Sequence, residues 1–292
     1  MRPARRRPRP DGEKRSWTSW ALPVIGVLSL AVIWELGSLV IRLTSDHPNT
    51  IWPSLRYVWN EALPGIGSVG DTSATAQPQD GLHAGYGAAF EVLWRESLVT
   101  IRRVVLGSAI GVVIGVGLGF AVALISYVRR FLYPPVNVVR TFPLLALTLL
   151  FLIWFGGSEV GVYSFIAFGV STMLFVNTVS AVRNVPAIHI RYARTLGASR
   201  GRVFRTVIVP AVMPELMSGL QVALGLAWAM ALAAEYLGTQ SGLGRLILFF
   251  ELFQYTGRMV VVVALFVIWA LVAYLLLDVL GKRVTRWVPR SA

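Results

Sequence analysis

Few residues of this chain could perform catalytic chemistry. The 292 residues include no cysteine and only three histidines, His47, His83 and His189, which are far apart in the sequence. A metal site needs ligands at short, regular spacings, and a cysteine nucleophile needs the thiol itself. The motif H-E-x-x-H and the nucleotide-binding G-x-x-x-x-G-K-[ST] are also absent from the sequence. The sequence therefore predicts no catalytic residue, no metal site and no cofactor bound by this chain.

Polar residues inside apolar segments are the candidates for a transport pathway. A carboxylate within a membrane is costly and usually faces protein or water. Glu235 is therefore either a gate or pathway contact or a structural hydrogen-bond acceptor or ion-pair partner, whereas Glu35 is expected to make a structural or peripheral contact. Asn177 and Ser171 either supply hydrogen bonds in a pathway or bind neighbouring helices.

The segment 191–214, RYARTLGASRGRVFRTVIVPAVMP, predicts two short helices joined at a glycine. Gly197 suits the left-handed residue that ends a helix, and Ser199 can cap the next one. Pro210 and Pro214 are expected to end the second helix and to begin the next apolar segment. The apolar face of the second helix would carry Val203, Phe204, Val207 and Ile208. Such an element is either a docking surface or an interfacial helix that rests on lipid headgroups.

The elements that carry these residues belong in a membrane. Hydrophobic residues make up 55% of the chain and charged residues only 14%, whereas about 25% of residues are charged in a soluble domain. Several apolar segments approach the roughly 20 residues needed to cross a bilayer. The expected spans are residues 20–41, 104–126, 142–155, 160–182, 215–236 and 260–280. The sequence therefore predicts an all-α integral membrane protein with six transmembrane helices.

The basic residues predict the orientation. Most of the 27 lysines and arginines lie in the two tails and in alternate connections, which places both termini in the cytoplasm. The net charge of +13 then reflects topology and contact with anionic lipid, and no nucleic-acid partner is predicted. A secretory signal is the alternative for the N-terminus, but its apolar region is too long and no A-x-A-like site follows. The expected location is a prokaryotic cytoplasmic membrane.

These expectations divide the chain into five parts. They are a basic tail (1–16), a first transmembrane helix (17–43), an external loop (44–96), a five-helix core (97–281) that includes residues 186–214, and a cytoplasmic C-terminal tail (282–292). The middle of the external loop is small, polar and rich in glycine, which predicts a flexible segment. Its flanks, 52–63 and 90–105, are expected to form amphipathic helices, and the second should continue into the second span.

Residues 191–214 resemble the EAA loop in permease subunits of ATP-binding-cassette importers, whose pattern is E-A-A-x3-G-x9-I-x-L-P. The matching positions here are Ala193, Gly197, Val207, Val209 and Pro210. The sequence departs from the pattern at Arg191 and Tyr192, where the family has Glu and Ala. That departure removes the basis for an ion pair between the Glu and the ATPase, but the helix–glycine–helix geometry is retained.

A much longer part of the chain resembles the nitrate, sulfonate and taurine branch of these permeases. The resemblance rests on L-G-A-S, P-x-x-x-P, A-E-x-x-G and G-L-G motifs, on a W-F-G element and on a series of glycines at every fourth residue. In this sequence they are Leu196–Ser199, Pro210 and Pro214, Ala234–Glu235 with Gly238, Gly242–Gly244, Trp154–Gly156, and Gly111, Gly115 and Gly119. The glycine series also predicts close packing against another helix.

The resemblance implies a type I importer permease with the MetI-like architecture and a cytoplasmic coupling helix. Two copies, as a homodimer, would each dock onto one cytosolic ATPase subunit, which binds ATP and Mg²⁺, while an extracytoplasmic solute-binding protein delivers the substrate. ATP-driven closure would then alternate access for a sulfonate, taurine, nitrate or another small molecule. The residues implied to couple to the ATPase are Ala193, Leu196, Gly197, Ala198, Val203, Phe204, Val207 and Pro210.

A secondary transporter or channel without an ATPase partner is the alternative function. Such a protein carries its coupling charges inside the spans, and only Glu35 and Glu235 are available for that role. A membrane enzyme is disfavoured because the sequence has no cysteine, three histidines outside the expected spans and no H-E-x-x-H motif.

Overall fold

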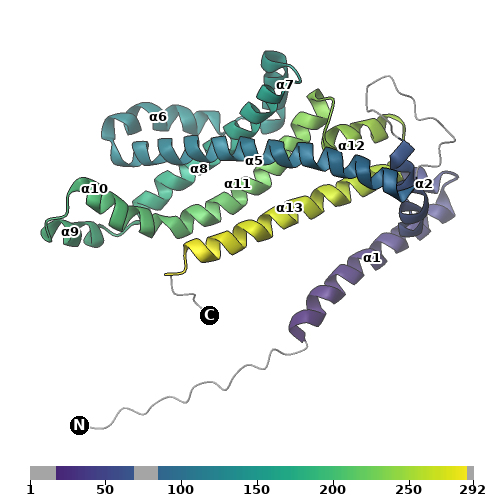
Figure 1. The fold of residues 1–292 in the computed structure, drawn as a ribbon, viewed down its shortest axis with the longest axis horizontal. Coiled ribbons are helices and arrows are strands. Elements are labelled where there is room, and N and C mark those ends of the chain that lie inside the picture. The colour runs from purple at the N-terminus through teal and green to yellow at the C-terminus, as the bar shows by residue number, and fades with distance from the viewer. Residues whose placement is uncertain (1–17, 69–84, 288–292) are drawn as a thin grey trace, which may run out of the picture.

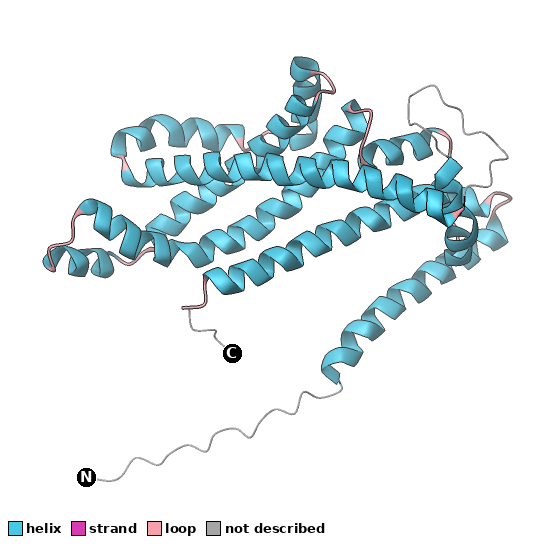
Figure 2. Cartoon of the chain, viewed as in Figure 1, coloured by secondary structure: helices cyan, strands magenta, loops and turns pink. Residues whose placement is uncertain are grey.

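The computed structural model describes residues 18–68 and 85–287. The expected basic tail, the middle of the expected external loop and the end of the C-terminal tail fall in 1–17, 69–84 and 288–292 and lie outside the described residues. Within the two described ranges, every regular element is a helix (Figures 1 and 2). The α-helices are α1 (Thr18–Thr44), α2 (Pro48–Ile51), α3 (Leu55–Tyr57), α4 (Leu63–Gly65), α5 (Tyr86–Leu124), α6 (Ser126–Val139), α7 (Leu144–Phe155), α8 (Glu159–Asn184), α9 (Ala187–Thr195), α10 (Arg200–Val203), α11 (Val209–Gly238), α12 (Leu243–Leu252) and α13 (Thr256–Val284).

The described residues contain five helical stretches that are long and apolar enough to cross a membrane. They lie in α1, α5, α8, the continuous stretch Arg200–Gly238, and α13. A sixth span exists if α6 and α7 are taken together, because the two helices are separated by a short break and bent by 100°. The prediction of an all-α membrane protein is confirmed, with five spans as single helical stretches and a sixth if α6 and α7 are counted together.

Close packing of α5 against α8 forms the centre of the molecule. The four glycines Gly107, Gly111, Gly115 and Gly119 are buried on one face of α5. A Cβ atom built at Gly115 would lie 2.5 Å from the carbonyl oxygen of Ser171 in α8. The glycines therefore allow the two backbones to approach closely, as small residues do in membrane helices. This confirms the close packing that the glycine series predicted.

Gly115→Ala is expected to lower the free energy of unfolding by about 1–3 kcal/mol, the range for inserting an atom into a packed core. The new methyl group would clash with the backbone of α8, which cannot move aside as a side chain would. Thermal unfolding of the purified protein in detergent measures the effect. Gly117→Ala is the matched control, because a Cβ atom at Gly117 has nothing within 4 Å. Equal loss of stability in both variants would contradict this packing.

The remaining core lies where α11, α12 and α13 pack beside α5 and α8 (Figure 1). Buried aromatic side chains fill the space between these helices, and they include Phe165 in α8 and Phe250 in α12. Trp228 in α11 meets Phe266 in α13 edge to face, with ring centroids 5.2 Å apart. Edge-to-face contact is a favoured aromatic geometry. These contacts hold α12 at the end of the bundle farthest from α9 and α10, and they hold α13 along the bundle (Figure 1).

Helix α1 leans away from the bundle and is attached through its second half (Figure 1). The indole N–H of Trp34 donates to the carbonyl of Pro53 at 2.9 Å, and that of Trp52 donates back to the carbonyl of Trp34 at 3.1 Å. The carboxylate of Glu35 accepts the backbone N–H of Leu55 at 3.1 Å. Glu35 thus has a structural role at the first turn of α3, as the sequence predicted.

The expected third span, 142–155, was wrong in extent. Helix α7 has only 12 residues, which is too short for a bilayer that needs about 20. The preceding residues, expected to be a cytoplasmic connection, form α6 and pack beside α5 and α8 through the cluster of Val122, Phe175 and Val179. The span therefore consists of two half-helices, α6 and α7, with a break at residues 140–143.

The two prolines after α10 do not end the helix, which corrects the sequence prediction. Helical backbone continues from Arg200 to Gly238, with Pro210 in the first turn of α11 and Pro214 inside it. A single wide turn, Phe204–Ile208, precedes Pro210, and there the N–H of Val209 bonds to the carbonyl of Phe204. Wide turns of this kind are rare, and they occur mostly as single turns inside α-helices. The extra residue lets the chain pass the proline without breaking.

Candidate functional site

The turn at Gly197 is a complete helix-ending motif. Gly197 has a φ of +80°, its N–H bonds to the carbonyl of Arg194 at 2.9 Å, and the N–H of Ala198 reaches the carbonyl of Ala193 at 3.1 Å. These two bonds satisfy carbonyls that the end of α9 would leave unpaired. Ser199 then caps α10 by accepting the N–H of Arg202. Gly197 and Ser199 thus have the local roles that the sequence predicted.

The apolar face of α10 and the turn after it points into the protein itself. Val203 and Ile208 are buried in a cluster with Ala181, Val212 and Leu216. The half-buried Phe204 and Val207 pack against the same cluster, and Phe204 also meets Phe120 of α5 edge to face at 5.2 Å. Three of the expected coupling residues, Val203, Phe204 and Val207, therefore pack the segment against the helices of the bundle.

The outer surface of the segment belongs to α9 and to the turn. Leu196 is 71% exposed, and Ile188 and Tyr192 of α9 are also well exposed. Arg191 and Arg194 lie on the same helix and are exposed. Ala193, Ala198 and Pro210 are half-buried, Gly197 is exposed, and all four shape the segment through their backbone. The accessible surface is thus a mixture of apolar and basic side chains.

A polar clamp joins the two ends of this segment. The side-chain amide of Asn184, the last residue of α8, donates to both carboxylate oxygens of Glu215 in α11 at 3.1 Å. The two helices that enter and leave the segment are therefore held together at its base.

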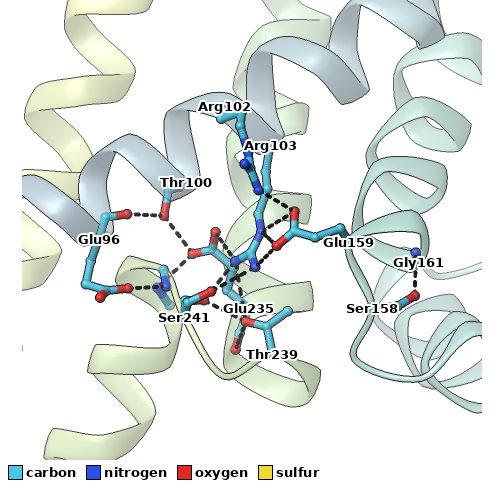
Figure 3. Close-up of polar contacts among 12 residues, drawn as sticks. Glu96, Thr100, Arg102, Arg103, Ser158, Glu159, Gly161, Glu235, Thr239 and Ser241 are labelled. Atoms are coloured by element: carbon cyan, nitrogen blue, oxygen red, sulfur yellow. Dashed lines mark hydrogen bonds and ion pairs between the residues drawn. The ribbon is translucent and has the colours of Figure 1, made fainter. Parts of the chain in front are cut away.

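A second polar cluster lies near the start of α8, at the opposite end of the bundle (Figure 3). Arg103 of α5 is 2% exposed. Its guanidinium pairs with the fully buried Glu235 of α11 at 3.1 Å and with Glu159 of α8. It also donates to the backbone carbonyl of Ser241 at 2.7 Å. One arginine therefore connects three spans and the turn before α12, and two carboxylates compensate its charge.

The same cluster caps the N-terminus of α12. Glu96 accepts the N–H of Gly242 at 2.6 Å, Thr100 accepts that of Leu243 at 2.9 Å, and Glu235 accepts that of Gly244 at 3.0 Å. These are N–H groups that a helix leaves unpaired at its start, and carboxylates there interact favourably with the helix dipole. Of the two roles considered for Glu235, the structure shows hydrogen-bond acceptor and ion-pair partner.

A cavity of about 640 Å³ lies between the broken span, α8 and α11. Its polar lining residues are Arg140, Thr141, Thr172, Asn177 and Ser180; we call this space the central cavity. Thr172 stands near the middle of α8 and Leu226, another lining residue, near the middle of α11. The central cavity is therefore at mid-depth in the membrane domain.

Of the two residues expected in a pathway, Asn177 lines the central cavity. Ser171 lies outside its lining, because its hydroxyl donates to the carbonyl of Phe168 at 3.0 Å and its backbone packs on Gly115. The described residues hold no cluster of side chains suited to a metal ion.

Two arginines lie where the sequence did not predict them. Arg140 falls between the expected spans 104–126 and 142–155, in a connection predicted to be cytoplasmic, but it lines the central cavity. Arg103 directly precedes the expected span 104–126, on its external side, although it is buried. Its position in the run IRRVVLG, at the start of an apolar span, was the available signal, since an intramembrane arginine needs a partner. The partners Glu159 and Glu235 are too far away in sequence to be identified without the fold.

The comparison with known protein families decides the identity of the chain. A model described as "Binding-protein-dependent transport system inner membrane component" matches residues 100–286, which is more than half of the sequence. The chain belongs to this family. It is a permease subunit of an ATP-binding-cassette importer, and as such it is not an enzyme. ATP hydrolysis and substrate capture belong to separate ATPase and substrate-binding components of the system.

The permease is similar to curated proteins over most of its length. It is 30% identical over 270 residues to the taurine transport system permease protein TauC of Escherichia coli K12, covering 89% of this chain and 91% of that protein. It is 26% identical over 271 residues to the bicarbonate transport system permease protein CmpB of Synechococcus elongatus, covering 92% and 90%. These relatives agree with the branch that the sequence motifs indicated.

The fold of the permease matches solved transporters. It is similar to a chain of the MetNI methionine transporter with a TM-score of 0.58, at 21% identity, covering 69% of this chain and 98% of that one. The MetI-like architecture that was predicted is thereby confirmed. With the family established, the alternative of a secondary transporter or channel is set aside.

Proposed function

We propose that this permease imports a small anion across a prokaryotic cytoplasmic membrane as a homodimer, and that residues 191–214 are its contact with the ATPase. The observation that carries the coupling assignment is the exposed Leu196 turn on a segment whose ends are clamped together. Leu196, Ile188 and Tyr192 are apolar surface on an element that projects from one end of the bundle (Figure 1). Exposed apolar groups rimmed by charge are typical of protein contact sites.

The segment has the stiffness that coupling requires. Its apolar residues Val203 and Ile208 are packed into the bundle, its turn is fully hydrogen-bonded, and Asn184 and Glu215 join its ends. A push on Leu196 would therefore tilt α8 and α11 as a unit. In this proposal Val203, Phe204 and Val207 transmit the movement, while Ala193, Leu196, Gly197, Ala198 and Pro210 form or shape the contact. ATP and Mg²⁺ bind to the partner ATPase, and this chain binds no cofactor.

The distribution of basic residues supports the orientation, with both termini and residues 191–214 in the cytoplasm. If Arg140 is counted within the membrane and not among the cytoplasmic basic residues, the cytoplasmic side still has the excess of basic residues. The exposed apolar faces of α1 and α13 would then contact lipid. The external solute-binding protein would dock at the end of the bundle that carries α2 and α12.

Two observations support an anion as substrate. The relatives TauC and CmpB are named for taurine and bicarbonate transport, and both compounds carry an anionic group. The polar side chains of the central cavity include an arginine, a serine hydroxyl and an amide, which can donate hydrogen bonds to an anion. Sulfonates and nitrate fit the same chemistry.

The coupling assignment predicts that Leu196→Asp abolishes the retention of the ATPase. Aspartate at the exposed tip would place a charge in an apolar contact, and the fold would be unaffected because Leu196 touches little of its own chain. The measurement is co-purification of the ATPase with tagged permease from its own membranes in mild detergent. Gly197→Glu, which strains a residue with a φ of +80°, is expected to have the same effect.

Leu252→Asp is the matched control, since Leu252 is 68% exposed and lies at the end of α12, away from residues 191–214. It should retain the ATPase at the level of the native chain. If Leu196→Asp binds as much ATPase as the native permease, the tip is not the contact. If the native permease itself brings down no ATPase, the coupling proposal fails as a whole.

A further inference from the structure

The broken span places a helix N-terminus and an arginine together in the central cavity. The N-terminus of α7 begins at Pro143 without any side-chain cap, and residues 140–143 join it to α6 across the 100° bend. Arg140 and Thr141 from this break, and Leu144 from the first turn of α7, line the cavity. Uncapped N–H groups at the start of a helix carry partial positive charge. Two positive groups from separate sources thus face one space.

Arg140 has no carboxylate to balance it. The ion pairs in the described part of the chain involve other residues, and the acidic partners of Arg103 are near the end of the bundle. A charged arginine at mid-depth is costly and is found facing a water-filled space or a partner. Because α8 contributes threonine, serine and asparagine and α11 contributes Leu226, but neither contributes an acid, the described lining of the cavity supplies no negative charge to Arg140.

The side chains around Arg140 complete a site for an anion. The hydroxyls of Thr141 and Thr172 line the same cavity but already donate to the backbone carbonyls of Val138 and Phe168. Ser180 and the side-chain NH₂ group of Asn177, which lie on the same lining, are the neutral donors that remain for an anion. In membrane transporters, anionic groups bind near the bilayer centre at the N-termini of broken helices.

We propose that the break between α6 and α7 is an anion-binding site on the translocation path. Arg140 is the anchoring residue, and the N-terminus of α7 is the second positive group. This inference rests on the proposed anionic substrate. Ser180 and the side-chain NH₂ group of Asn177, both from α8, supply the neutral hydrogen bonds. A volume of about 640 Å³ exceeds that of a small anion many times over, since one water occupies about 30 Å³. The anion therefore keeps part of its hydration and is held weakly enough to leave.

The test uses the complete transporter, reconstituted in proteoliposomes with its ATPase and solute-binding protein. The probes are isotope-labelled taurine, ethanesulfonate, nitrate and bicarbonate. Arg140→Gln is expected to lower uptake of the transported anion about 10-fold or more, because it removes a charge-assisted hydrogen bond. Arg140→Lys should recover part of the uptake, since it restores the charge. The matched control is Arg130→Gln, which removes an exposed arginine from α6 outside the central cavity and should transport normally.

A second measurement separates anion binding from a structural role. The transported anion at millimolar concentration, without the binding protein, should raise the melting temperature of the native permease, because a ligand stabilises the state that it binds. This shift should disappear in Arg140→Gln and remain in Arg130→Gln and Arg140→Lys. If Arg140→Gln showed the same shift in melting temperature and the same anion uptake as the native permease, the inference would be overturned while the proposed function remained intact. If the native complex transports none of the four anions, the proposed substrate class is wrong and the anion-binding site is rejected with it.

Discussion

Replacing Arg103 with glutamine is expected to lower the free energy of unfolding of the permease by about 3–5 kcal/mol, the range for breaking a buried ion pair by removing one partner. The guanidinium is 2% exposed and the carboxylate of Glu235 is fully buried. Without the arginine, the carboxylate of Glu235 loses its ion-pair partner in a low-dielectric core and is left with hydrogen bonds from Thr100 and Gly244. Unfolding in detergent, followed by tryptophan fluorescence, measures the loss.

Two further variants test whether the loss comes from buried charge. Arg102→Gln changes the adjacent arginine, which is 56% exposed and contacts Glu159 at 3.2 Å, and it should cost about 0–1 kcal/mol as exposed pairs do. The double variant Arg103→Gln with Glu235→Gln should be more stable than Arg103→Gln alone, because it removes the uncompensated charge. If Arg103→Gln and Arg102→Gln behaved alike, burial would not matter at this site.

Gly242→Ala is expected to destabilise the permease by about 2–6 kcal/mol. Gly242 has a φ of +102° and a ψ of 165°, a region that costs a residue with a side chain about 1–3 kcal/mol. Its new Cβ atom would also lie 2.4 Å from the carboxylate carbon of Glu235, which adds about 1–3 kcal/mol for overpacking. The variant should therefore disturb the cap of α12 as well as the backbone. Denaturant unfolding of the purified permease gives the size of the effect.

Gly156→Ala isolates the contribution of the backbone. Gly156 has a φ of 62° and a ψ of −166°, but a Cβ atom there would meet nothing within 4 Å. Its cost should be confined to the backbone strain of about 1–3 kcal/mol. If Gly242→Ala lowered the free energy of unfolding no more than Gly156→Ala does, the contact with Glu235 would add nothing to the destabilisation.

Local patterns in the sequence were sufficient to predict the elements that depend on residues close together in the chain. The turn at Gly197 and the cap at Ser199 depend on residues within one helical turn, and both are present in the structure. The spacing of Gly111, Gly115 and Gly119 places small residues on one face, and that face packs against α8. The motifs around these residues also identified the family, which the comparisons then confirmed.

Proline was interpreted too strictly. Pro210 and Pro214 were expected to end a helix, because proline lacks an N–H and clashes with the preceding turn. The wide turn Phe204–Ile208 removes that conflict before Pro210, and packing of Val212 and Leu216 into the cluster under α10 holds the continuous helix in place. The continuous helix depends on these tertiary contacts, so the sequence pattern alone does not predict it.

By itself, the sequence determined the membrane class, the number of spans and the family, because these depend on composition and on short motifs. Only the tertiary structure decided which charged residues lie in the membrane and what they face. Arg103 needs Glu159 and Glu235, which are 56 and 132 residues away in the chain, and Arg140 lies at a break that hydropathy averages into one span. A charge at mid-depth is tolerated only where the fold supplies a partner or a polar cavity, so its role depends on residues that only the folded chain brings together.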